Sequence, residues 1–376
     1  MQIYDGTHQT PNYIDDGIKF VSVENINNLD KTNKYISRED YEKDFKIKPE
    51  INDILMTRIG DIGTPAIINT NERYAYYVSL ALLKSNYAIL SPKFLIQRIS
   101  SEQFQHELWK RTLHVAFPKK INKNEIGECN VFIPPLPEQE KIASFLTLID
   151  KKIEKQKELV ELLKKYKRGL LSQIFSQKLR FKDDNGNNYP DWEEKRLGDI
   201  CKIIGGGTPD TNNAKYWGDD INWFTPTEII KKYVDCSNRK ISNLGLLRSS
   251  AKILPIGTVL LTTRATLGEM SILQIEATTN QGFQSLIPNK NLVTSEFIYY
   301  CQPIIKYFCY KYANGSTFLE ISKQTLAKLK LMIPNEGEQN KISDFLSKFD
   351  DKIQQEECLL NNVQTYKKGL LQQMFI

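Results

Sequence analysis

Residues 133–142 read IPPLPEQEKI and residues 333–342 read IPNEGEQNKI, so one short motif occurs twice at a long interval. The match continues without a gap to residues 175 and 375, and nearly half of the paired positions are identical. Arrays of short structural repeats have periods of about 20–50 residues, which this interval far exceeds. The repeat therefore indicates a duplicated half-protein and divides the chain into two related halves.

Both copies of the repeat have the apolar pattern of a long helix with a coiled-coil seam. Apolar residues recur at alternating steps of four and three, the heptad pattern of helices that pack along one stripe. The seam of the first copy contains Ile142, Leu146, Ile149, Ile153, Val160, Leu163, Leu170 and Ile174. The seam of the second copy contains Ile342, Leu346, Phe349, Ile353, Leu360, Val363, Leu370 and Met374. One such helix is as often an ordinary packing helix, but two related seams favour an antiparallel pair with a pseudo-two-fold axis.

Polar residues interrupt the two seams at matching depths and also open both helices. A polar seam residue lowers stability and can fix the register of a coiled coil. The interruptions are Gln156 and Lys167 in the first copy and Glu356 and Lys367 in the second. The helix starts carry Glu138 and Gln139 in the first copy and Glu338 and Gln339 in the second. We assign these starts and the seams to one paired-helix element.

The segments before the two helices are richer in strand formers and turn residues, and they share landmarks. The paired landmarks are a glycine–threonine–proline turn at 5–11 and 205–209, strand-like stretches at 17–26 and 220–229, and 54–58 matched by 259–264. Between the landmarks the two sequences diverge. We therefore predict an α+β fold in which two mixed α/β domains are joined by two long helices. The expected boundaries are 1–132 for the first domain, 133–182 for the first helix region, 183–332 for the second domain and 333–376 for the second helix region.

Composition narrows the class of protein without deciding it. The net charge of +6 allows a polyanionic partner but does not require one. No run of 18 or more apolar residues predicts a membrane span, and the first residues do not resemble a signal peptide. The six cysteines form no C-x-x-C pair and only three histidines are present, so we expect reduced thiols in the cytoplasm and no metal site.

The order of these parts resembles the specificity subunit of type I restriction–modification enzymes. The resemblance rests on IPPLPEQEKIA with its helix ending YKRGLL at 166–171, and on the run from LRF at 179–181 to YPDWEEKRLGD at 189–199. It covers nearly the whole chain and implies two target-recognition domains that each read half of a split DNA site. It also implies helices that set the gap and bind two methyltransferase subunits, with motor nuclease subunits joining the full complex. The subunit itself would hold no cofactor and no catalytic site.

The first domain departs from the family pattern at its start. Trp192 and the run from Leu197 to Asp199 lead into the second domain, whereas the first domain begins almost directly at its glycine turn. The corresponding lead-in is absent before Met1, as in a truncated copy or a chain whose start was assigned too late. We therefore expect the first domain to lack an edge strand.

The side chains that we expect to contact DNA are those able to bind base edges or phosphates. Arginine can bind guanine with two hydrogen bonds, and asparagine or glutamine can bind adenine in the same way. Arg58 and Arg264 rank first, each following a threonine (Thr57, Thr263) near a glycine turn, although structural ion pairs are equally plausible. The other candidates are Thr7, Gln9, Asn12, Lys119, Lys120, Thr208, Asn212, Asn280, Gln281 and Lys323. For these the alternatives are turn hydrogen bonds and ordinary surface lysines.

Enzymatic motifs are absent from the sequence, which leaves binding functions to compare. Residues 205–208 are glycine-rich, but no G-K-[ST] follows, so they do not form a nucleotide P-loop. The three histidines lack the neighbours of a catalytic triad or a metal cluster. Two other interpretations remain open, a coiled-coil scaffold whose domains bind proteins and a truncated silent copy used as a recombination cassette. Salt-dependent DNA affinity distinguishes the first, and co-purification with a methyltransferase the second.

Overall fold

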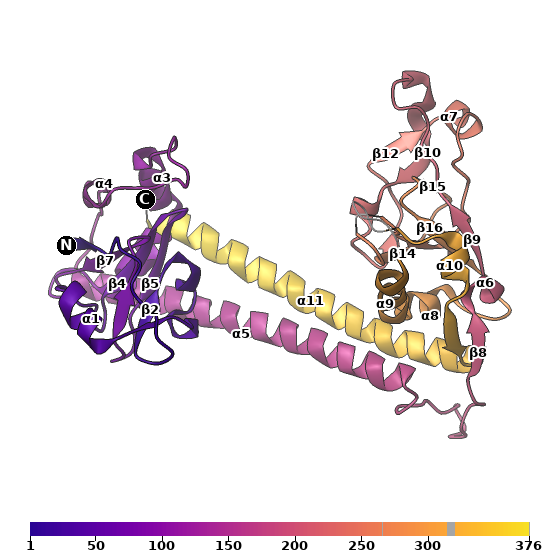
Figure 1. Ribbon diagram of the computed structural model, residues 1–376, viewed down its shortest axis with the longest axis horizontal. Helices are drawn as coiled ribbons and strands as arrows, with labels where there is room; N and C mark the ends of the chain where they lie inside the picture. Colours follow the sequence, from indigo (N-terminus) through magenta and orange to yellow (C-terminus); the bar gives the residue numbers. More distant parts are fainter. Residues whose placement is uncertain (265, 314–319, 376) are drawn as a thin grey trace. The chain divides into compact units, whose positions relative to one another are not determined.

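The structure, a computed structural model, describes residues 1–264, 266–313 and 320–375. The chain divides into two compact units, of which unit 1 comprises Met1–Val160 with Gln355–Ile376 and unit 2 comprises Glu161–Gln354. Figure 1 shows both units and labels many of their helices and strands. In the part of the chain that the structure describes, no helix is long and apolar enough to cross a membrane.

Unit 1 contains two small sheets. The first is antiparallel, in the order β1-β7-β4-β5, and the second has the order β3-β2-β6 with β2 and β6 parallel. The strands are β1 Gln2–Asp5, β2 Ile18–Val21, β3 Tyr35–Ile36, β4 Ile54–Ile59, β5 Asp61–Ile67, β6 Tyr74–Tyr76 and β7 Leu80–Lys84. The helices are η1 Val23–Asn25, η2 Leu29–Lys31, α1 Arg38–Asp44, α2 Pro92–Ile99, α3 Glu102–Arg111 and α4 Lys123–Gly127.

The described residues of unit 2 form three sheets. Their orders are β11-β14-β13-β16-β9, β12-β10-β15 and β17-β8. The strands are β8 Glu193–Arg196, β9 Cys201–Gly205, β10 Trp217–Phe224, β11 Tyr233–Val234, β12 Arg239–Ile241, β13 Val259–Leu261, β14 Met270–Leu273, β15 Thr278–Thr279, β16 Gln284–Pro288 and β17 Lys330–Ile333. The helices are α6 Leu197–Ile200, η3 Ala214–Tyr216, η4 Pro226–Glu228, α7 Asn243–Leu247, α8 Ser295–Tyr300, α9 Gln302–Tyr312 and α10 Lys323–Ala327.

The two units share one topology. The order β1-β7-β4-β5 in unit 1 corresponds to β9-β16-β13-β14 in unit 2, and all of these neighbours are antiparallel. The order β3-β2-β6 corresponds to β12-β10-β15, and in both cases the last two strands are parallel. The pair β8–β17 has no counterpart among the described residues of unit 1. The landmarks seen in the sequence are therefore equivalent structural elements.

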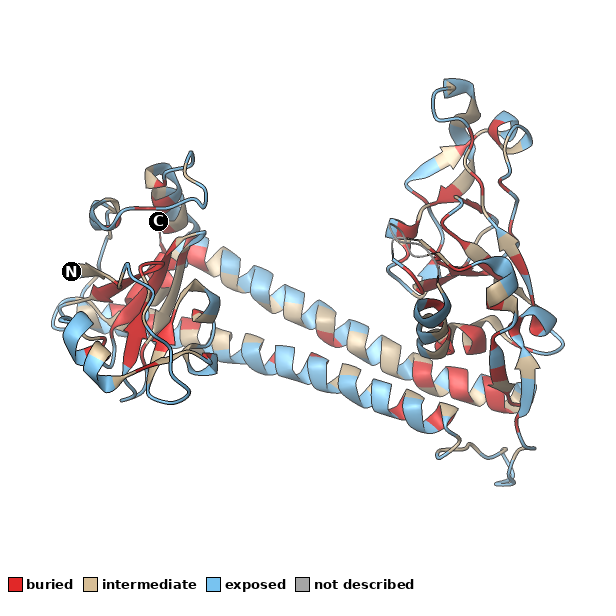
Figure 2. Cartoon of the chain, in the orientation of Figure 1, coloured by how far each residue is buried: buried red, intermediate tan, exposed pale blue. Residues whose placement is uncertain are grey.

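The central strand of each unit separates two apolar clusters. Successive side chains of a strand point to opposite faces of its sheet, so a strand covered on both faces is apolar throughout. In unit 1, Leu55 packs with Phe20 on one face of β4, while Met56 packs with the helices on the other. In unit 2, Leu260 packs with Phe224, while Val259 joins the cluster that contains α8. In Figure 2, buried segments are seen on the strands of each unit.

Two long helices follow the two domains, α5 Leu136–Phe175 and α11 Glu336–Met374, and the division between the units falls within both. Unit 1 contains the first part of α5 and the last part of α11. There Leu146 packs with Leu371 in a cluster that also holds Phe94 of α2. Farther along α5, Gln156 Nε2 donates to Glu356 Oε2 at 2.5 Å. As the residue numbers of the contacts increase along α5, those of their partners on α11 decrease. The two segments are therefore antiparallel.

Unit 2 contains the other ends of the same two helices. Ile174 near the end of α5 belongs to one apolar cluster with Ile342 and Leu346 near the start of α11. Earlier on α5, the ring of Tyr166 lies 5.7 Å from the ring of Phe349, measured between centroids. These contacts also run in opposite directions along the two helices.

Candidate nucleic-acid interface and paired helices

Arg58, the first DNA candidate of unit 1, is buried inside the domain. Its Nη1 forms an ion pair with Asp5 of β1, and its Nε donates to the backbone oxygen of Ile121 at 3.0 Å. Its neighbour Thr57 is also buried and accepts a hydrogen bond at Oγ1 from the backbone nitrogen of Thr64 at 2.9 Å. This geometry favours the structural alternative for both residues, because the arginine fastens β1 to the chain before α4.

The structure corrects the pairing of Arg58 with Arg264. Thr262 Oγ1 accepts a hydrogen bond from the backbone nitrogen of Glu269 at 2.9 Å. Thr57 Oγ1 accepts the corresponding bond from Thr64, and in both cases the donor lies seven residues farther along the chain. Thr262 is thus the equivalent of Thr57, and buried Thr263 takes the place of Arg58. Arg264 lies one residue farther along, where it is part-exposed and pairs with Glu320 Oε2 at 2.8 Å. The two stretches were misaligned by one residue in the sequence comparison, because Thr262 and Thr263 are consecutive threonines.

The candidates of the second glycine turn lie together in unit 2. Thr208 Oγ1 hydrogen-bonds to Gln281 Oε1, and Asn280 Oδ1 accepts from the backbone nitrogen of Gly282 at 2.8 Å. A Cβ on Gly206 would lie 2.0 Å from the backbone oxygen of Asn280, so glycine is required for the two loops to approach. The loops at 205–212 and 280–282 thus form one surface.

The remaining candidates lie at the surfaces of the two units. In unit 1, Thr7 Oγ1 hydrogen-bonds to the backbone of Gln9 in a local turn. The backbone oxygen of Lys119 accepts a hydrogen bond from the backbone nitrogen of Gly60 at 2.8 Å. The exposed candidates are Gln9, Asn12, Lys119, Lys120, Asn212, Gln281 and Lys323, and the part-exposed ones are Thr7, Thr208, Arg264 and Asn280. Thr57, Arg58 and Thr263 are buried.

Sequence reasoning missed a cationic side chain beside the second glycine turn. The guanidinium carbon of Arg239 in β12 lies 3.6 Å from the ring centroid of Trp217. Trp217 packs edge-on against Trp223 at 5.0 Å, and both indole nitrogens donate to the glycine-turn loop, at Asp210 O and Gly207 O. Stacking on an indole holds a guanidinium plane in place while its donors stay free. The sequence signal that could have revealed this side chain is the presence of basic residues on a strand that follows two tryptophans.

Unit 1 has a cation near an aromatic ring at the same position, but this lysine, Lys34, also pairs with Glu24 Oε2 at 3.4 Å. The ring of Tyr13 packs edge-on against Phe20 at 5.6 Å, and Lys34 Nζ lies 5.8 Å from the Tyr13 centroid. Strand pairing makes Lys34 the equivalent of Arg239, because each lies two residues before the isoleucine that faces Ile18 or Ile221. A lysine is a point charge and an arginine a planar fork, so the two units present different chemistry at one position.

The helix starts are fastened to the preceding domain in the same way in both units. Gln139 Nε2 donates to the backbone oxygens of Ile89 at 2.9 Å and Pro134 at 2.8 Å, and its Oε1 accepts from Ser91 N at 2.9 Å. Gln339 repeats this pattern in unit 2. Its amide donates to the oxygens of Leu292 and Pro334, both at 2.9 Å, and accepts from Thr294 N at 2.9 Å. Each glutamine has no exposed surface.

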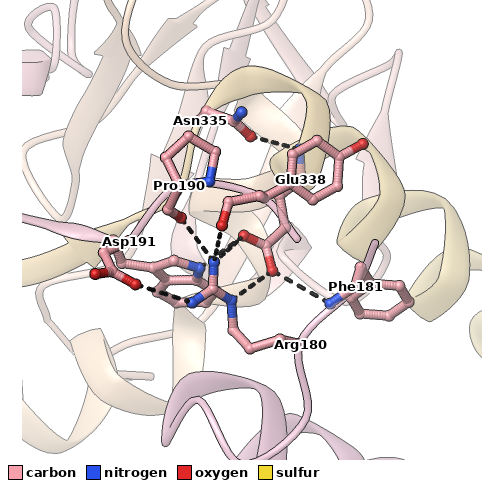
Figure 3. Close-up of polar contacts among 8 residues, drawn as sticks. Arg180, Phe181, Pro190, Asp191, Asn335 and Glu338 are labelled. Atoms are coloured by element: carbon pink, nitrogen blue, oxygen red, sulfur yellow. Dashed lines mark hydrogen bonds and ion pairs between the residues drawn. The ribbon is translucent and has the colours of Figure 1, made fainter. Parts of the chain in front are cut away.

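The glutamates beside those glutamines differ completely. Glu338 has no exposed surface and accepts from Arg180 Nε at 2.8 Å, Trp192 Nε1 at 2.9 Å and Phe181 N at 3.3 Å. Figure 3 shows this cluster, in which the guanidinium also reaches the backbone oxygen of Pro190 at 2.7 Å. The carboxylate raises the pKa of Arg180 above its usual value. Glu138, by contrast, is exposed.

The carboxylates Asp150 and Asp350 each receive two donors. In unit 1, Lys367 Nζ lies 2.5 Å from Asp150 Oδ1, and Gln97 of α2 donates to Asp150 Oδ2 at 2.8 Å. In unit 2, Lys167 forms an ion pair with Asp350, and Tyr300 of α8 donates to Asp350 Oδ2 at 2.7 Å. Burial raises the pKa of the Tyr300 hydroxyl, which keeps it a donor. The lysines that interrupt the apolar seams thus pair with aspartates on the opposite helix.

The other helix candidates line the contacts between the helices or lie at their edges. Those that are buried are Gln139, Leu146, Leu170, Glu338, Gln339, Ile342 and Leu346. Those that are part-buried are Ile142, Ile149, Ile153, Leu163, Phe349, Ile353, Val363 and Leu370. Among the described residues, no group of three or more histidine, cysteine or acidic side chains could hold a metal ion.

Comparison with known proteins places both halves of the chain in one family. A family model described as the type I restriction modification DNA specificity domain matches residues 8–164 and again residues 189–365. The chain is 37% identical over 186 residues to the MjaIX specificity subunit of Methanocaldococcus jannaschii, covering 48% of this chain and 43% of that protein. It is 24% identical over 335 residues to the putative MjaX specificity subunit of the same organism, covering 85% and 77%. The chain thus spans less than half the length of the first of these relatives.

Solved structures show the same fold. The S subunit of a type I restriction–modification system from M. genitalium aligns with a TM-score of 0.57 and 16% identity, covering 100% of this chain and 93% of that one. A chain from a structure of complex assembly and conformational transition of the type I R-M system aligns with a TM-score of 0.58 and 17% identity, covering 87% and 82%. At these identities the likeness concerns the fold.

Proposed function

Because the chain belongs to the family of type I restriction–modification DNA specificity subunits, we propose that it reads a bipartite, asymmetric DNA site for a methyltransferase complex. The domain at 1–132 recognises one half-site and the domain at 183–332 the other. The regions 133–182 and 333–376 form an antiparallel coiled coil with a pseudo-two-fold axis, which fixes the gap between half-sites. The chain supplies recognition, and its partner subunits supply the chemistry.

The observation that carries this proposal is that the two units share a topology but have different side chains at an equivalent surface position. The order β1-β7-β4-β5 corresponds to β9-β16-β13-β14 and the order β3-β2-β6 to β12-β10-β15, while β11 is an additional strand of unit 2. At the equivalent cation–aromatic position, however, unit 1 has Lys34 over Tyr13 and unit 2 has Arg239 over Trp217. Side chains on base edges specify sequence, while contacts to phosphate position the protein. Two readers with one scaffold and different side chains should therefore read two different half-sites.

The DNA contacts that we propose are the exposed candidates around these positions. In unit 2, Arg239 offers a fork that fits guanine, and Gln281 and Asn212 offer amides that fit adenine. In unit 1, Gln9 and Asn12 offer amides, while Lys34, Lys119, Lys120 and unit 2's Lys323 offer charges for phosphates. We leave Arg58 out of this set because its ion pair with Asp5 is buried.

The methyltransferase partners dock, in this proposal, on apolar side chains that the helices expose. On α11 in unit 1, Leu359 is 41% exposed and Tyr366 is 59% exposed. On α5 in unit 2, Leu162 is 63% exposed and Tyr166 is 57% exposed. Exposed apolar groups of this size mark protein interfaces when they recur on one element. Tyr166 and Tyr366 occupy equivalent positions in the repeat, which suits two copies of one partner.

DNA titrations at several salt concentrations test this function against a scaffold function. We expect affinity for duplex DNA to fall linearly with salt on a double-logarithmic plot, because bound lysine and arginine release counterions. A scaffold whose domains bind only proteins would show no such affinity at any salt concentration.

Co-purification with the methyltransferase tests the docking surfaces. The double variant Tyr166→Ala/Tyr366→Ala should lose the partner, while Leu247→Ala on α7, 80% exposed but away from both helices, should retain it. Retention by the double variant would contradict docking at these tyrosines.

A further inference from the structure

We infer that the loop of residues 113–120 in unit 1 is a wedge that inserts its apolar tip between stacked base pairs of the bound duplex. The tip consists of Val115 and Phe117. The inference rests on the proposed DNA-reading function and deepens it. It assigns to unit 1 a set of residues that deform the duplex instead of hydrogen-bonding to its base edges.

The tip of the loop is exposed to an unusual degree. Phe117 is 104% exposed, as in an extended peptide, and Val115 is 98% exposed. No other large apolar side chain among the described residues is more than 81% exposed. Single exposed apolar residues are common on protein surfaces. Two fully exposed ones on one short loop contribute little to the packing of the unit and are free to contact a ligand.

The base of the loop is fixed to the central sheet of unit 1. The backbone nitrogen of Leu113 donates to the oxygen of Lys120 at 2.8 Å, which closes the loop. The nitrogen of Ile121 then donates to the oxygen of Arg58 in β4 at 3.0 Å, and the Arg58 Nε donates back to the oxygen of Ile121 at 3.0 Å. The buried arginine thus positions the loop. A fixed base favours binding, because less conformational freedom is lost when the tip inserts.

The first half of the loop is supported by the end of α3. The Nε2 atom of His114 lies 2.9 Å from the backbone oxygen of Trp109, and the two rings lie 4.8 Å apart between centroids. The Trp109 ring is in turn parallel to the ring of His106, with centroids 6.1 Å apart. The loop is therefore held on both sides, and only its tip extends into solvent.

The charges beside the tip favour DNA over an apolar protein surface as the ligand. Lys119 and Lys120 follow the tip directly and are exposed, and in the described part of the chain neither forms an ion pair. Lys123, by contrast, lies 3.9 Å from an oxygen of Asp5. In a duplex, phosphates flank every stack of apolar bases. An apolar tip bordered by two unpaired cations matches that arrangement.

The consequence for recognition is specificity through the stiffness of the DNA. Apolar side chains that enter between base pairs partly unstack them and bend the duplex. Phe117 has the flat ring that can replace a stacking neighbour, and Val115 lies beside it. Pyrimidine–purine steps unstack more easily than others, so insertion there costs less. The loop therefore selects a flexible step in the half-site of unit 1.

Bending and stacking measurements with the full chain test this inference. The probe is a duplex that the chain enriches from a random DNA library, with a dye pair at its ends and 2-aminopurine replacing each adenine in turn. We expect energy transfer between the dyes to rise on binding, and 2-aminopurine fluorescence to rise at one step where a base is unstacked. Phe117→Ala should abolish both changes and weaken binding about tenfold, the value of one lost stacking contact.

Three control variants separate the tip from its surroundings. Phe132→Ala removes another exposed phenylalanine of unit 1, 77% exposed and outside the loop, and should leave both signals unchanged. Phe117→Leu should retain the bend, because leucine also acts as a wedge. The double variant Lys119→Ala/Lys120→Ala should weaken binding and its salt dependence, yet keep both signals at saturation. Circular dichroism melts check that each variant folds.

The outcomes distinguish failure of the wedge from failure of the proposed function. DNA that binds without either signal, or a Phe117→Ala variant that keeps both, would overturn the wedge and leave DNA reading intact. If Phe117→Ala bends DNA normally but no longer co-purifies with the methyltransferase, the tip binds protein and the inference is wrong. A library that yields no bound duplex contradicts DNA reading and the wedge together. Loss of both signals in Phe117→Ala, with Phe132→Ala unchanged, supports the inference directly.

Discussion

The two helix starts carry the same Glu-Gln pair, yet only the glutamine has the same environment in both units. Gln139 and Gln339 are both fully buried and each makes three hydrogen bonds to the preceding domain. Glu338 is equally buried among Arg180, Trp192 and Phe181, whereas Glu138 is exposed. Glu138 and Glu338 are therefore identical residues at equivalent positions that have different structural roles.

This difference distinguishes two structural roles of the repeated Glu-Gln motif. The glutamine joins each helix to the domain before it, which both halves of a duplicated protein need. Glu338 joins its helix to the segment that leads into the same preceding domain, and among the described residues this arrangement is present in unit 2. The burial of a carboxylate is costly unless donors surround it, so the glutamate is buried only where the donors are present.

The largest expected effect comes from removing the charge of the buried glutamate. Glu338→Gln should lower the free energy of unfolding of unit 2 by about 3 kcal/mol, because Arg180 loses its partner in a buried site. Glu138→Gln is the matched control and should change stability by less than about 0.5 kcal/mol, as expected for a surface substitution. Urea denaturation followed by tryptophan fluorescence measures this, since Trp192, Trp217 and Trp223 lie in unit 2 and the tryptophan of unit 1, Trp109, is 59% exposed in the folded chain. Equal effects of the two variants would remove the distinction between the helix starts.

The glutamine substitutions should instead have equal effects. Gln139→Ala and Gln339→Ala each leave one backbone N–H and two carbonyl oxygens without their side-chain partner, at a cost of about 2 kcal/mol. Urea denaturation followed by circular dichroism compares them. A difference of more than about 1 kcal/mol between the two would mean that the helices are anchored differently.

Recognition by the two units should differ at the equivalent cations. Arg239→Ala should cost about 1–2 kcal/mol of DNA affinity and relax one position of one half-site if, as we propose, the guanidinium over Trp217 contacts a base edge. Lys34→Ala should weaken binding to all sequences and reduce the salt dependence, as expected for a phosphate contact. Titrations with a set of half-site variants measure both. Uniform weakening by Arg239→Ala would reassign that arginine to phosphate.

The smallest expected effects are those of the paired lysines in the helix seams. Lys367→Ala and Lys167→Ala each remove an ion pair to Asp150 or Asp350 in which the lysine side chain is 16% exposed. Each should cost about 1 kcal/mol, since part-exposed pairs contribute little. Thermal denaturation of the two variants checks both values. A stabilised variant would contradict a role for these lysines in the helix contacts.

The sequence predicted the large features of the fold because each depends on a repeated local pattern. The heptad steps from Ile142 to Ile174 predicted the long helix, and the Glu-Gln motif marked its start. The strand stretches after the glycine turns became β2 and β10. The resemblance to type I specificity subunits is confirmed by the family match over both halves.

The candidate site was less predictable because it depends on contacts distant in sequence. The burial of Arg58 follows from Asp5, which lies more than fifty residues away, and no local pattern reveals that ion pair. The stacking of Arg239 on Trp217 requires β12 to pair with β10, a register that the sequence left undefined. The Glu338 cluster likewise joins residues on both sides of a whole domain.

A methylation map of DNA from cells that carry this chain and its methyltransferase partner tests the account most directly. Two dissimilar readers on one duplex should methylate a bipartite site whose halves differ and are separated by a gap of constant length. Methylation at a continuous palindrome would contradict the account, because a single reader or two identical ones would then be at work.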